Sequence, residues 1–195
     1  ARGVRIGVNL SPRQFVGGAL VRSVEDALTA SGFPPALLEL EITESVAMSN
    51  LELTLDTLRQ LRALGVSVVL DDFGVGHSSL AYLKSFALDA LKIDRSFMAQ
   101  VPGTPADEAL ITAIVEMAKG LSLRVVAEGV ERVEQVAFLR SRGCRVAQGF
   151  LFSRPLPPDE ALAAAVAPPG KGRAEGGVGD GGGGAPPSTR RHPAG

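Results

Sequence analysis

Short apolar runs alternate along this chain with longer segments in which apolar residues recur every three or four positions. The runs are rich in leucine or β-branched residues and are bounded by turn residues, which is typical of buried strands. They cover residues 4–10, 37–42, 66–71, 90–94, 124–128 and 145–150. The pattern therefore predicts six strands, with helices between most of them.

The predicted helices begin at capping residues or prolines, and several stop at glycines. They cover residues 11–32, 51–64, 105–121 and 131–141, and a last, alanine-rich helix starts at Pro157. Strand and helix thus alternate with a repeat of roughly 20–35 residues, as in the βα units of a parallel sheet. The spacing admits a (β/α)8 barrel or an open, doubly wound sheet.

One observation favours a barrel over an open sheet, and another shows that the barrel would be incomplete. No GxGxxG or Walker A pattern follows the first strand, which weakens the case for a nucleotide-binding open sheet. Six strands cannot close an eight-stranded barrel, so we expect an incomplete TIM-like α/β barrel whose first two strands lie upstream of Ala1. Because an incomplete barrel exposes sheet edges, we expect residues 1–195 alone to be inactive or poorly folded.

Composition divides the chain into two parts. With 195 residues, of which 45% are hydrophobic, the chain can form one domain with a sizeable core, which we place at residues 1–167. Residues 168–195 are rich in glycine and proline, and Val178 is their only large aliphatic residue. Such a segment cannot bury enough apolar surface to fold, so we expect a disordered tail.

Charge and cysteine content narrow the function classes. The chain has 20 basic and 21 acidic residues, which gives no electrostatic reason to expect a nucleic acid polymer or a membrane surface as a partner. The single cysteine, Cys144, excludes an internal disulfide and fits a reducing compartment. The sequence contains no signal peptide and no apolar run long enough to span a bilayer, so we expect a cytoplasmic location unless an upstream region carries an anchor.

Polar residues recur where the predicted strands end. Buried strands do not normally finish in carboxylates, because a buried unpaired charge is costly. Here four successive strand ends carry carboxylates, joined by an amide and an amine: Asn9, Glu41, Asp71, Asp72, Lys92, Asp94 and Glu128. In a parallel sheet these ends meet at one edge. The sequence therefore predicts a shared polar centre that binds cations.

Asp71 and Asp72 are the centre of this prediction. Adjacent carboxylates at a strand end can hold two hard cations, and oxygen ligands favour Mg²⁺ or Mn²⁺ over zinc. Two such ions about 3.5–4 Å apart suit phosphodiester cleavage. The alternative is structural: Asp72 would cap the following turn, and Asp71 would accept a hydrogen bond from a backbone amide.

Other residues at the strand ends have two interpretations each. Lys92 points to the same side of its strand as Asp94, so it could stabilise phosphate charge or simply pair with that aspartate. Glu128 precedes a flexible glycine and suits a metal ligand, a general base or a helix cap. Asn9 could be a ligand or a turn residue. Gln148 could contact a base or a phosphate, or cap its strand.

These motifs together resemble the EAL domain family, the bacterial cyclic di-guanylate phosphodiesterases. The similarity covers residues 4–156, and the matching segments in order are VNLSP, EITE, DDFG, LKID, AEGVE, QGF and FSRPL. The resemblance implies a (β/α)8 barrel with one antiparallel strand, two Mg²⁺ or Mn²⁺ ions, and hydrolysis of cyclic di-GMP to linear pGpG. A homodimer and an upstream GGDEF or sensory domain are also expected from it.

The resemblance also implies roles for individual residues. The metal ligands would be Asn9, Glu41, Asp71, Asp72 and Glu128. The catalytic groups would be Glu128, Glu131 and Lys92, the last holding the attacking water. Substrate would contact Gln148 and Asp94. A loop over residues 72–79, which couples metal binding to dimerisation in this family, would be stabilised by Glu44, Gly74 and Ser78.

The chain departs from the family pattern in two ways. The signature Glu-Ala-Leu-x-Arg strand is absent, and the triplets at 108–110 and 160–162 fall in predicted helices. One metal-binding glutamate and one phosphate-binding arginine are therefore missing from these residues. In the loop, Val75 and His77 stand where the family usually has Thr and Tyr. A rival interpretation is a degenerate EAL domain that acts as a cyclic di-GMP receptor or interaction module.

Overall fold

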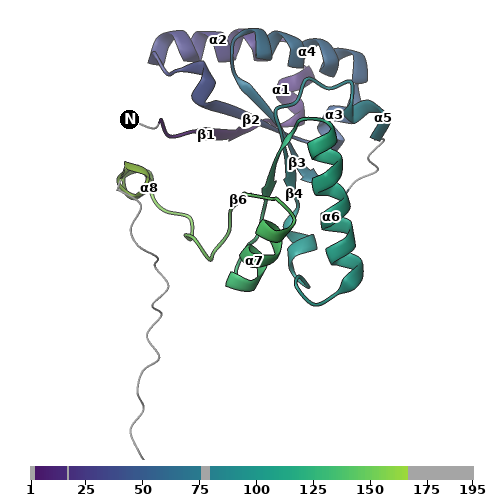
Figure 1. Ribbon diagram of the computed structural model, residues 1–195. Helices are drawn as coiled ribbons and strands as arrows, with labels where there is room; N and C mark the ends of the chain where they lie inside the picture. The colour runs from purple at the N-terminus through teal and green to yellow at the C-terminus, as the bar shows by residue number, and fades with distance from the viewer. Residues whose placement is uncertain (1–2, 17, 76–79, 167–195) are drawn as a thin grey trace, which may run out of the picture.

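A single parallel sheet organises the molecule (Figure 1). The computed structural model describes residues 3–16, 18–75 and 80–166. Its strands are β1 (Ile6–Asn9), β2 (Leu38–Thr43), β3 (Ser67–Phe73), β4 (Ala90–Ile93), β5 (Arg124–Ala127) and β6 (Val146–Ala147). They lie in the sheet in chain order, and all five pairings are parallel. The six predicted strands are confirmed.

The helices cover the outer side of the curled sheet, except the last one, which lies apart from it (Figure 1). They are α1 (Pro12–Val16), α2 (Leu20–Ser31), α3 (Glu44–Ser49), α4 (Leu51–Ala63), α5 (Leu80–Leu83), α6 (Pro105–Gly120), α7 (Val133–Ser141) and α8 (Pro158–Val166). Two 3-10 turns, η1 (Pro35–Leu37) and η2 (Arg95–Met98), follow α2 and β4. Within the part of the chain described here, no helix has both the length and the apolar character that a bilayer crossing needs.

Alternation along the strands separates an apolar face from a charged one. On β2, Leu40 and Ile42 are buried and belong to the apolar core, which also contains Leu58 and Leu61 of α4. Side chains alternate along a strand, so the residues between them, including Glu41, face the inner side of the sheet. The same alternation on β3 and β4 directs charged side chains inward. The helix-covered face thus supplies the stability, and the inner face is free to carry chemistry.

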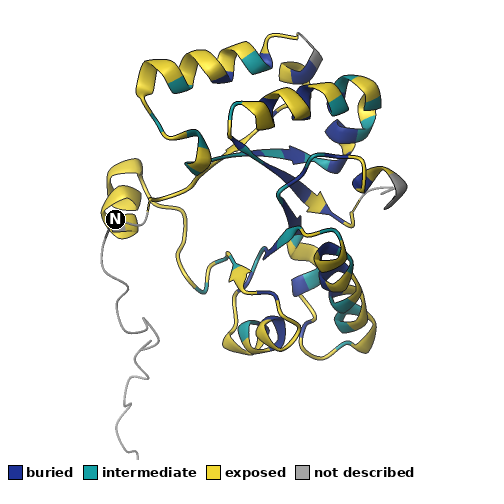
Figure 2. Ribbon diagram, turned by 45° about the horizontal axis from the view of Figure 1, so that its top comes forward, coloured by how far each residue is buried: buried dark blue, intermediate teal, exposed yellow. Residues whose placement is uncertain are grey.

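The sheet forms part of a barrel rather than a closed one. Its two outermost strands are β1, in which every residue is exposed, and β6, which has only two residues. Figure 2 shows buried strands in the centre of the sheet and exposed segments at both edges. This curled half-barrel agrees with the predicted incomplete (β/α)8 barrel.

Several predicted elements differ from those observed. The single helix predicted over 11–32 is wrong: α1 and α2 are separate, and Gly18 between them has a left-handed φ of 64°. The last strand was predicted over 145–150, but only Val146–Ala147 pairs with β5. The helix predicted from 131 begins at Val133. Helix α3 directly after β2 has no counterpart in the prediction.

The two Glu-Ala-Leu triplets lie in helices, as predicted. Residues 108–110 lie in α6 and residues 160–162 lie in α8, so neither belongs to a strand. The predicted disordered tail at 168–195 lies outside the described residues, as do His77 and Ser78.

Candidate metal and catalytic centre

Charged side chains meet at the carboxyl ends of the central strands. Glu41 lies near the end of β2, Asp71 and Asp72 near the end of β3, Lys92 on β4, and Glu128 directly after β5. In the sheet these strands are neighbours, so residues far apart in sequence come together on the inner face. The predicted shared polar centre is therefore present.

Lys92 is the hub of this centre. Its Nζ lies 2.8 Å from Oε2 of Glu41 and 3.3 Å from Oδ1 of Asp71, and it also contacts Oε1 of Glu128. The lysine is only 5% exposed. One ammonium group therefore links side chains from β2, β3 and the segment after β5. The predicted pairing of Lys92 with Asp94 is replaced by pairing with these three carboxylates.

A backbone irregularity brings Asp71 and Asp72 to the same site. Adjacent residues in a regular strand point to opposite faces. Here the β3–β4 pairing shifts register between Leu70 and Phe73, and Asp72 has a left-handed φ of 53°. Such a bulge re-aims side chains locally. The amide of Asp72 donates a 3.0 Å hydrogen bond to Oδ1 of Asp71, which holds the bend in place.

Three carboxylates form a group suited to a metal ion. Asp71, Asp72 and Glu128 each offer an oxygen, and these oxygens lie within 4.8 Å of one another. Glu41, Asp71 and Glu128 contact Lys92, and Asp72 adds a fourth carboxylate to the group. Hard oxygen donors and excess negative charge fit a divalent cation such as Mg²⁺ or Mn²⁺.

The pKa values in the centre follow from this crowding. Burial raises the pKa of Glu128, and the charges of Asp71 and Glu41 raise it further. Together these effects exceed the lowering of the pKa by Lys92. Burial also raises the pKa of Asp72, with added repulsion from Asp71. Burial alone would lower the pKa of Lys92, but its contacts with Glu128 and Glu41 raise it well above the usual range. Lys92 is therefore fully charged at neutral pH.

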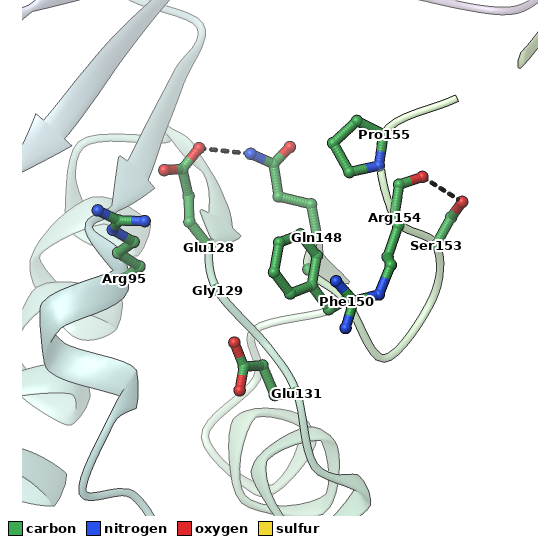
Figure 3. Close-up of a pocket in the computed structure, with 10 residues that line it drawn as sticks. Arg95, Glu128, Gly129, Glu131, Gln148, Phe150, Ser153, Arg154 and Pro155 are labelled. Carbon is green, nitrogen blue, oxygen red and sulfur yellow. Dashed lines mark hydrogen bonds between the residues drawn. The ribbon is translucent and has the colours of Figure 1, made fainter. Parts of the chain in front are cut away.

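A cavity of about 390 Å³ opens beside Glu128. Gln148 faces Glu128 across it, and its Nε2 donates a hydrogen bond to Oε1 of the carboxylate (Figure 3). Arg95 lies on the far side of Glu128, while Phe150 and Arg154 lie on the side of Gln148 (Figure 3). The cavity wall therefore combines arginine and glutamate side chains with an exposed aromatic ring.

Other predicted site residues lie around this centre. Asn9 is exposed at the end of β1 and is the register partner of Glu41. Asp94 caps η2 by accepting a 2.9 Å hydrogen bond from the amide of Ser96. Burial would raise the pKa of Asp94, but the hydrogen bonds from Ser96 lower it. Glu131 lines the cavity and, within the described residues, makes no salt bridge with Lys92.

Glu44 begins α3 and is buried. Among the described residues its Oε2 has no hydrogen-bond partner. It lines a small cavity with Phe73, one residue before Gly74, whose φ of 100° starts the following loop. An added Cβ at Gly74 would lie 2.8 Å from the ring of Phe97, so the close approach requires glycine. Glu44 thus lies close to the start of the loop that it is predicted to stabilise. Ser78 lies outside the described residues.

Sequence reasoning missed three residues of the cavity wall. Arg95, Phe150 and Arg154 were not singled out as site residues. The guanidinium of Arg154 lies over the ring of Phe150, 5.0 Å from its centroid. More than half of that phenylalanine is exposed. A signal was available, because an arginine and an aromatic residue directly after strand ends of a parallel sheet face the usual site of ligands.

Comparison with known proteins identifies a family. A family profile described as the EAL domain matches residues 1–155. The cyclic di-GMP phosphodiesterase NbdA of Pseudomonas aeruginosa is 49% identical over 154 residues, which are 79% of this chain and 20% of that protein. The chain thus spans about a fifth of the length of the curated relatives it matches first.

Solved structures match the fold as well. The PaMucR phosphodiesterase in complex with c-di-GMP is 46% identical with a TM-score of 0.77, covering 81% of this chain and 64% of that chain. The manganese and cyclic di-GMP complex of BlrP1 from Klebsiella pneumoniae is 34% identical with a TM-score of 0.73, covering 77% of this chain and 39% of that chain.

Proposed function

This chain belongs to the EAL domain family, and we propose that it supplies most of the active site of a cyclic di-GMP phosphodiesterase. The enzyme would hydrolyse one phosphodiester bond of the cyclic dinucleotide and release linear pGpG. The observation that carries this proposal is the buried Lys92 in contact with Glu41, Asp71 and Glu128, with Asp72 close by and an open cavity beside them. Relatives named as phosphodiesterases and a relative solved with the cyclic dinucleotide support it.

The strand-end oxygens would hold two Mg²⁺ or Mn²⁺ ions. The ligands would be Asn9, Glu41, Asp71, Asp72 and Glu128. When bound, the ions would supply positive charge that polarises the phosphate and lowers the pKa of the attacking water. The manganese complex of BlrP1 supports this choice of metal.

Lys92 and Glu128 have different tasks in this proposal. Because its carboxylate contacts raise the pKa of Lys92, the lysine cannot act as a base at neutral pH and serves as a fixed donor toward water or phosphate. Glu128 has a raised pKa, which suits a group that accepts a proton from the attacking water. Glu131, on the cavity wall, is a second candidate for proton transfer.

The cavity would hold the substrate. Gln148 and Asp94 would contact the nucleotide, and Gln148 also orients Glu128 through its hydrogen bond. Arg95 and Arg154 line the same cavity, and guanidinium groups suit phosphate oxygens and stack on flat rings.

Further predictions from the family extend this proposal. The domain would occupy residues 1–167, followed by a disordered tail. It would dimerise through the region of the 72–79 loop, braced by Glu44, Gly74 and Ser78. A GGDEF or sensory domain would precede it in a cytoplasmic protein. The name of MucR from Pseudomonas aeruginosa, a bifunctional diguanylate cyclase and phosphodiesterase, supports the pairing with a GGDEF domain.

Turnover of cyclic di-GMP with Mn²⁺ tests the proposed function. The protein is extended at its N-terminus to the length of the solved EAL domains, and Glu128→Ala is compared with it. We expect pGpG from the unaltered protein and a loss of about 10²–10⁴-fold in kcat for the variant, as for removal of a general base. Glu116→Ala is the control, because this exposed glutamate pairs with Lys119 and, among the described residues, with no other cation.

The outcomes separate two functions. Turnover that depends on Glu128 and persists in the control supports the phosphodiesterase. Saturable binding of cyclic di-GMP without product from the unaltered protein would overturn it in favour of a receptor.

A further inference from the structure

Gln135 is a buried polar residue outside the carboxylate centre. It lies in the first turn of α7 and is 3% exposed. Its Oε1 accepts hydrogen bonds from the amides of Glu131 at 2.8 Å and Arg132 at 2.9 Å, while its Nε2 donates to the carbonyl of Met98 at 2.7 Å. The side-chain amide therefore has partners on both its oxygen and its nitrogen.

These three bonds connect the segments that follow two neighbouring strands. Glu131 and Arg132 end the turn after β5, and that turn begins with Glu128. Met98 ends η2, the turn after β4. The regular pairing of the two strands stops at Ile93 and Ala127, followed by one bond from the amide of Glu128 to the carbonyl of Ile93. Beyond that point, the side chain of Gln135 connects the segment after β5 to η2.

The two segments touch where Gln135 holds them. Gly129 has a left-handed φ of 67°, and an added Cβ there would lie 2.5 Å from the Cβ of Arg95. The backbone after β5 thus lies directly against η2. Arg95, Glu128 and Gly129 all line the cavity, so the spacing of these segments determines its shape (Figure 3). The side chain of Arg132 adds a 2.7 Å hydrogen bond to the carbonyl of Val101 on the same side.

We propose that Gln135 is a positioning residue, whose amide fixes the turn after β5 against η2 and so holds Glu128 beside Lys92 and the cavity. This inference deepens the proposed phosphodiesterase function and rests on it. Gln135 does not touch the cavity centre itself. It acts through the backbone of the Glu128–Arg132 turn, as residues behind metal ligands commonly do.

A simpler role for Gln135 would be to cap α7. Its oxygen accepts bonds from the backbone at the start of that helix, and glutamate serves this capping role as well as glutamine. The capping role needs only the oxygen. The positioning role also needs the nitrogen, because only that atom reaches Met98. The two roles therefore differ in one atom.

Gln135→Glu separates the two roles, because it keeps the acceptor oxygen and replaces the donor to Met98 with a second oxygen. We expect this variant to lose about 10–100-fold in Mn²⁺ affinity and in kcat, the usual range for residues behind metal ligands. Gln135→Leu, which removes every bond, should lose at least as much. Gln60→Glu is the matched control, since Gln60 makes its side-chain hydrogen bond to Asp56 on the exposed surface.

The experiment uses the N-terminally extended protein, with Mn²⁺ binding measured by calorimetry and turnover measured separately. Wild-type affinity and kcat in Gln135→Glu would overturn the proposal and leave Gln135 as a helix cap. If the unaltered protein binds Mn²⁺ without turnover, the phosphodiesterase fails, while the metal affinities still test the role of Gln135.

Gly129→Ala provides an independent test if Gln135→Glu does not fold. An added Cβ would lie 2.5 Å from the Cβ of Arg95, so the substitution pushes the turn away from η2 while Gln135 itself is unaltered. We expect the same loss of Mn²⁺ affinity. Wild-type affinity in this variant would show that the spacing of the two segments does not matter, and would overturn the proposal.

Discussion

Two ionic clusters lie on the inner face of the same sheet and differ in their balance of charge. Glu39 and Glu41 are two residues apart on β2 and so share that face. Glu39 Oε1 accepts from Arg5 at 2.8 Å and from Arg124 at 2.6 Å. Glu41 instead joins the cluster around Lys92. The first cluster has two cations for one carboxylate, and the second has one cation for four carboxylates.

The two clusters differ in whether their excess charge is exposed to water. In the Glu39 cluster, the excess positive charge belongs to arginines whose side chains are 52% and 34% exposed, so water can solvate it. In the Lys92 cluster, the excess negative charge is largely buried and can be relieved only by protons or cations. A cluster whose charges are balanced or solvated connects strands, whereas one with buried excess negative charge suits a divalent cation.

Lys92 is the one cation of its cluster among the described residues, and removing it should have the largest effect on stability. Lys92→Met leaves Glu41, Asp71 and Glu128 facing one another without a counter-charge. We expect the free energy of unfolding to fall by about 3–5 kcal/mol without metal, the usual cost of breaking a buried ion pair. Urea denaturation with EDTA measures it. Lys119→Met, which removes an exposed pair, is the control. A loss below about 1 kcal/mol would show that the carboxylates do not repel one another.

Metal should stabilise the same cluster in a way that depends on pH. Mn²⁺ at a hundred times its Kd should add about 2.7 kcal/mol to the free energy of unfolding. Burial raises the pKa of Glu128 and of Asp72, so protons compete with metal and the gain should shrink as pH falls through these raised values. Thermal unfolding with and without Mn²⁺ between about pH 4 and about pH 8 measures this. A gain that is independent of pH would place the metal elsewhere.

The metal-free protein should show the opposite trend for these two groups. A carboxyl whose pKa is raised by folding contributes stability that is fully present below its unfolded pKa. That contribution is lost as pH rises through the folded pKa. Glu128→Gln should therefore reduce the loss of stability on the alkaline side when EDTA is present.

The Glu39 cluster should give the smallest effect. Arg124→Met removes one of two arginines from Glu39, and the other remains. Because the pair is partly exposed, we expect a loss of about 0–1 kcal/mol in stability and unchanged Mn²⁺ affinity. Calorimetry of Mn²⁺ binding decides the point, and weaker binding would show that the two clusters are coupled.

Much of the fold and the centre could be predicted because strand ends carry a strong local signal. The apolar run before Asp71 fixes a buried strand, and a charge directly after it must lie at the carboxyl edge of the sheet. The same reasoning places Lys92 and Glu128. These predictions needed only the period of the side chains and the parallel order of the strands.

The missed features depend on contacts between segments distant in sequence. The register shift at Asp71 and Asp72 arises from the pairing of β3 with β4, which no local pattern reveals. Gln135 lies in the first turn of a helix and resembles an ordinary polar residue until Met98 is placed opposite it. The prediction used a cap at Ser11 and a stop near Gly32, and so ran one helix across Gly18, where the left-handed backbone separates α1 from α2.

The order of the sheet has a consequence for how the protein is made. Each strand pairs with the strand that precedes it in the chain, so the sheet can grow one strand at a time as the polypeptide leaves the ribosome. Lys92 reaches Glu41 and Asp71 when the fourth of these strands docks, but it meets Glu128 only after the fifth. The scaffold can therefore form progressively during synthesis, while the set of charges around Lys92 is complete only after the fifth strand has docked.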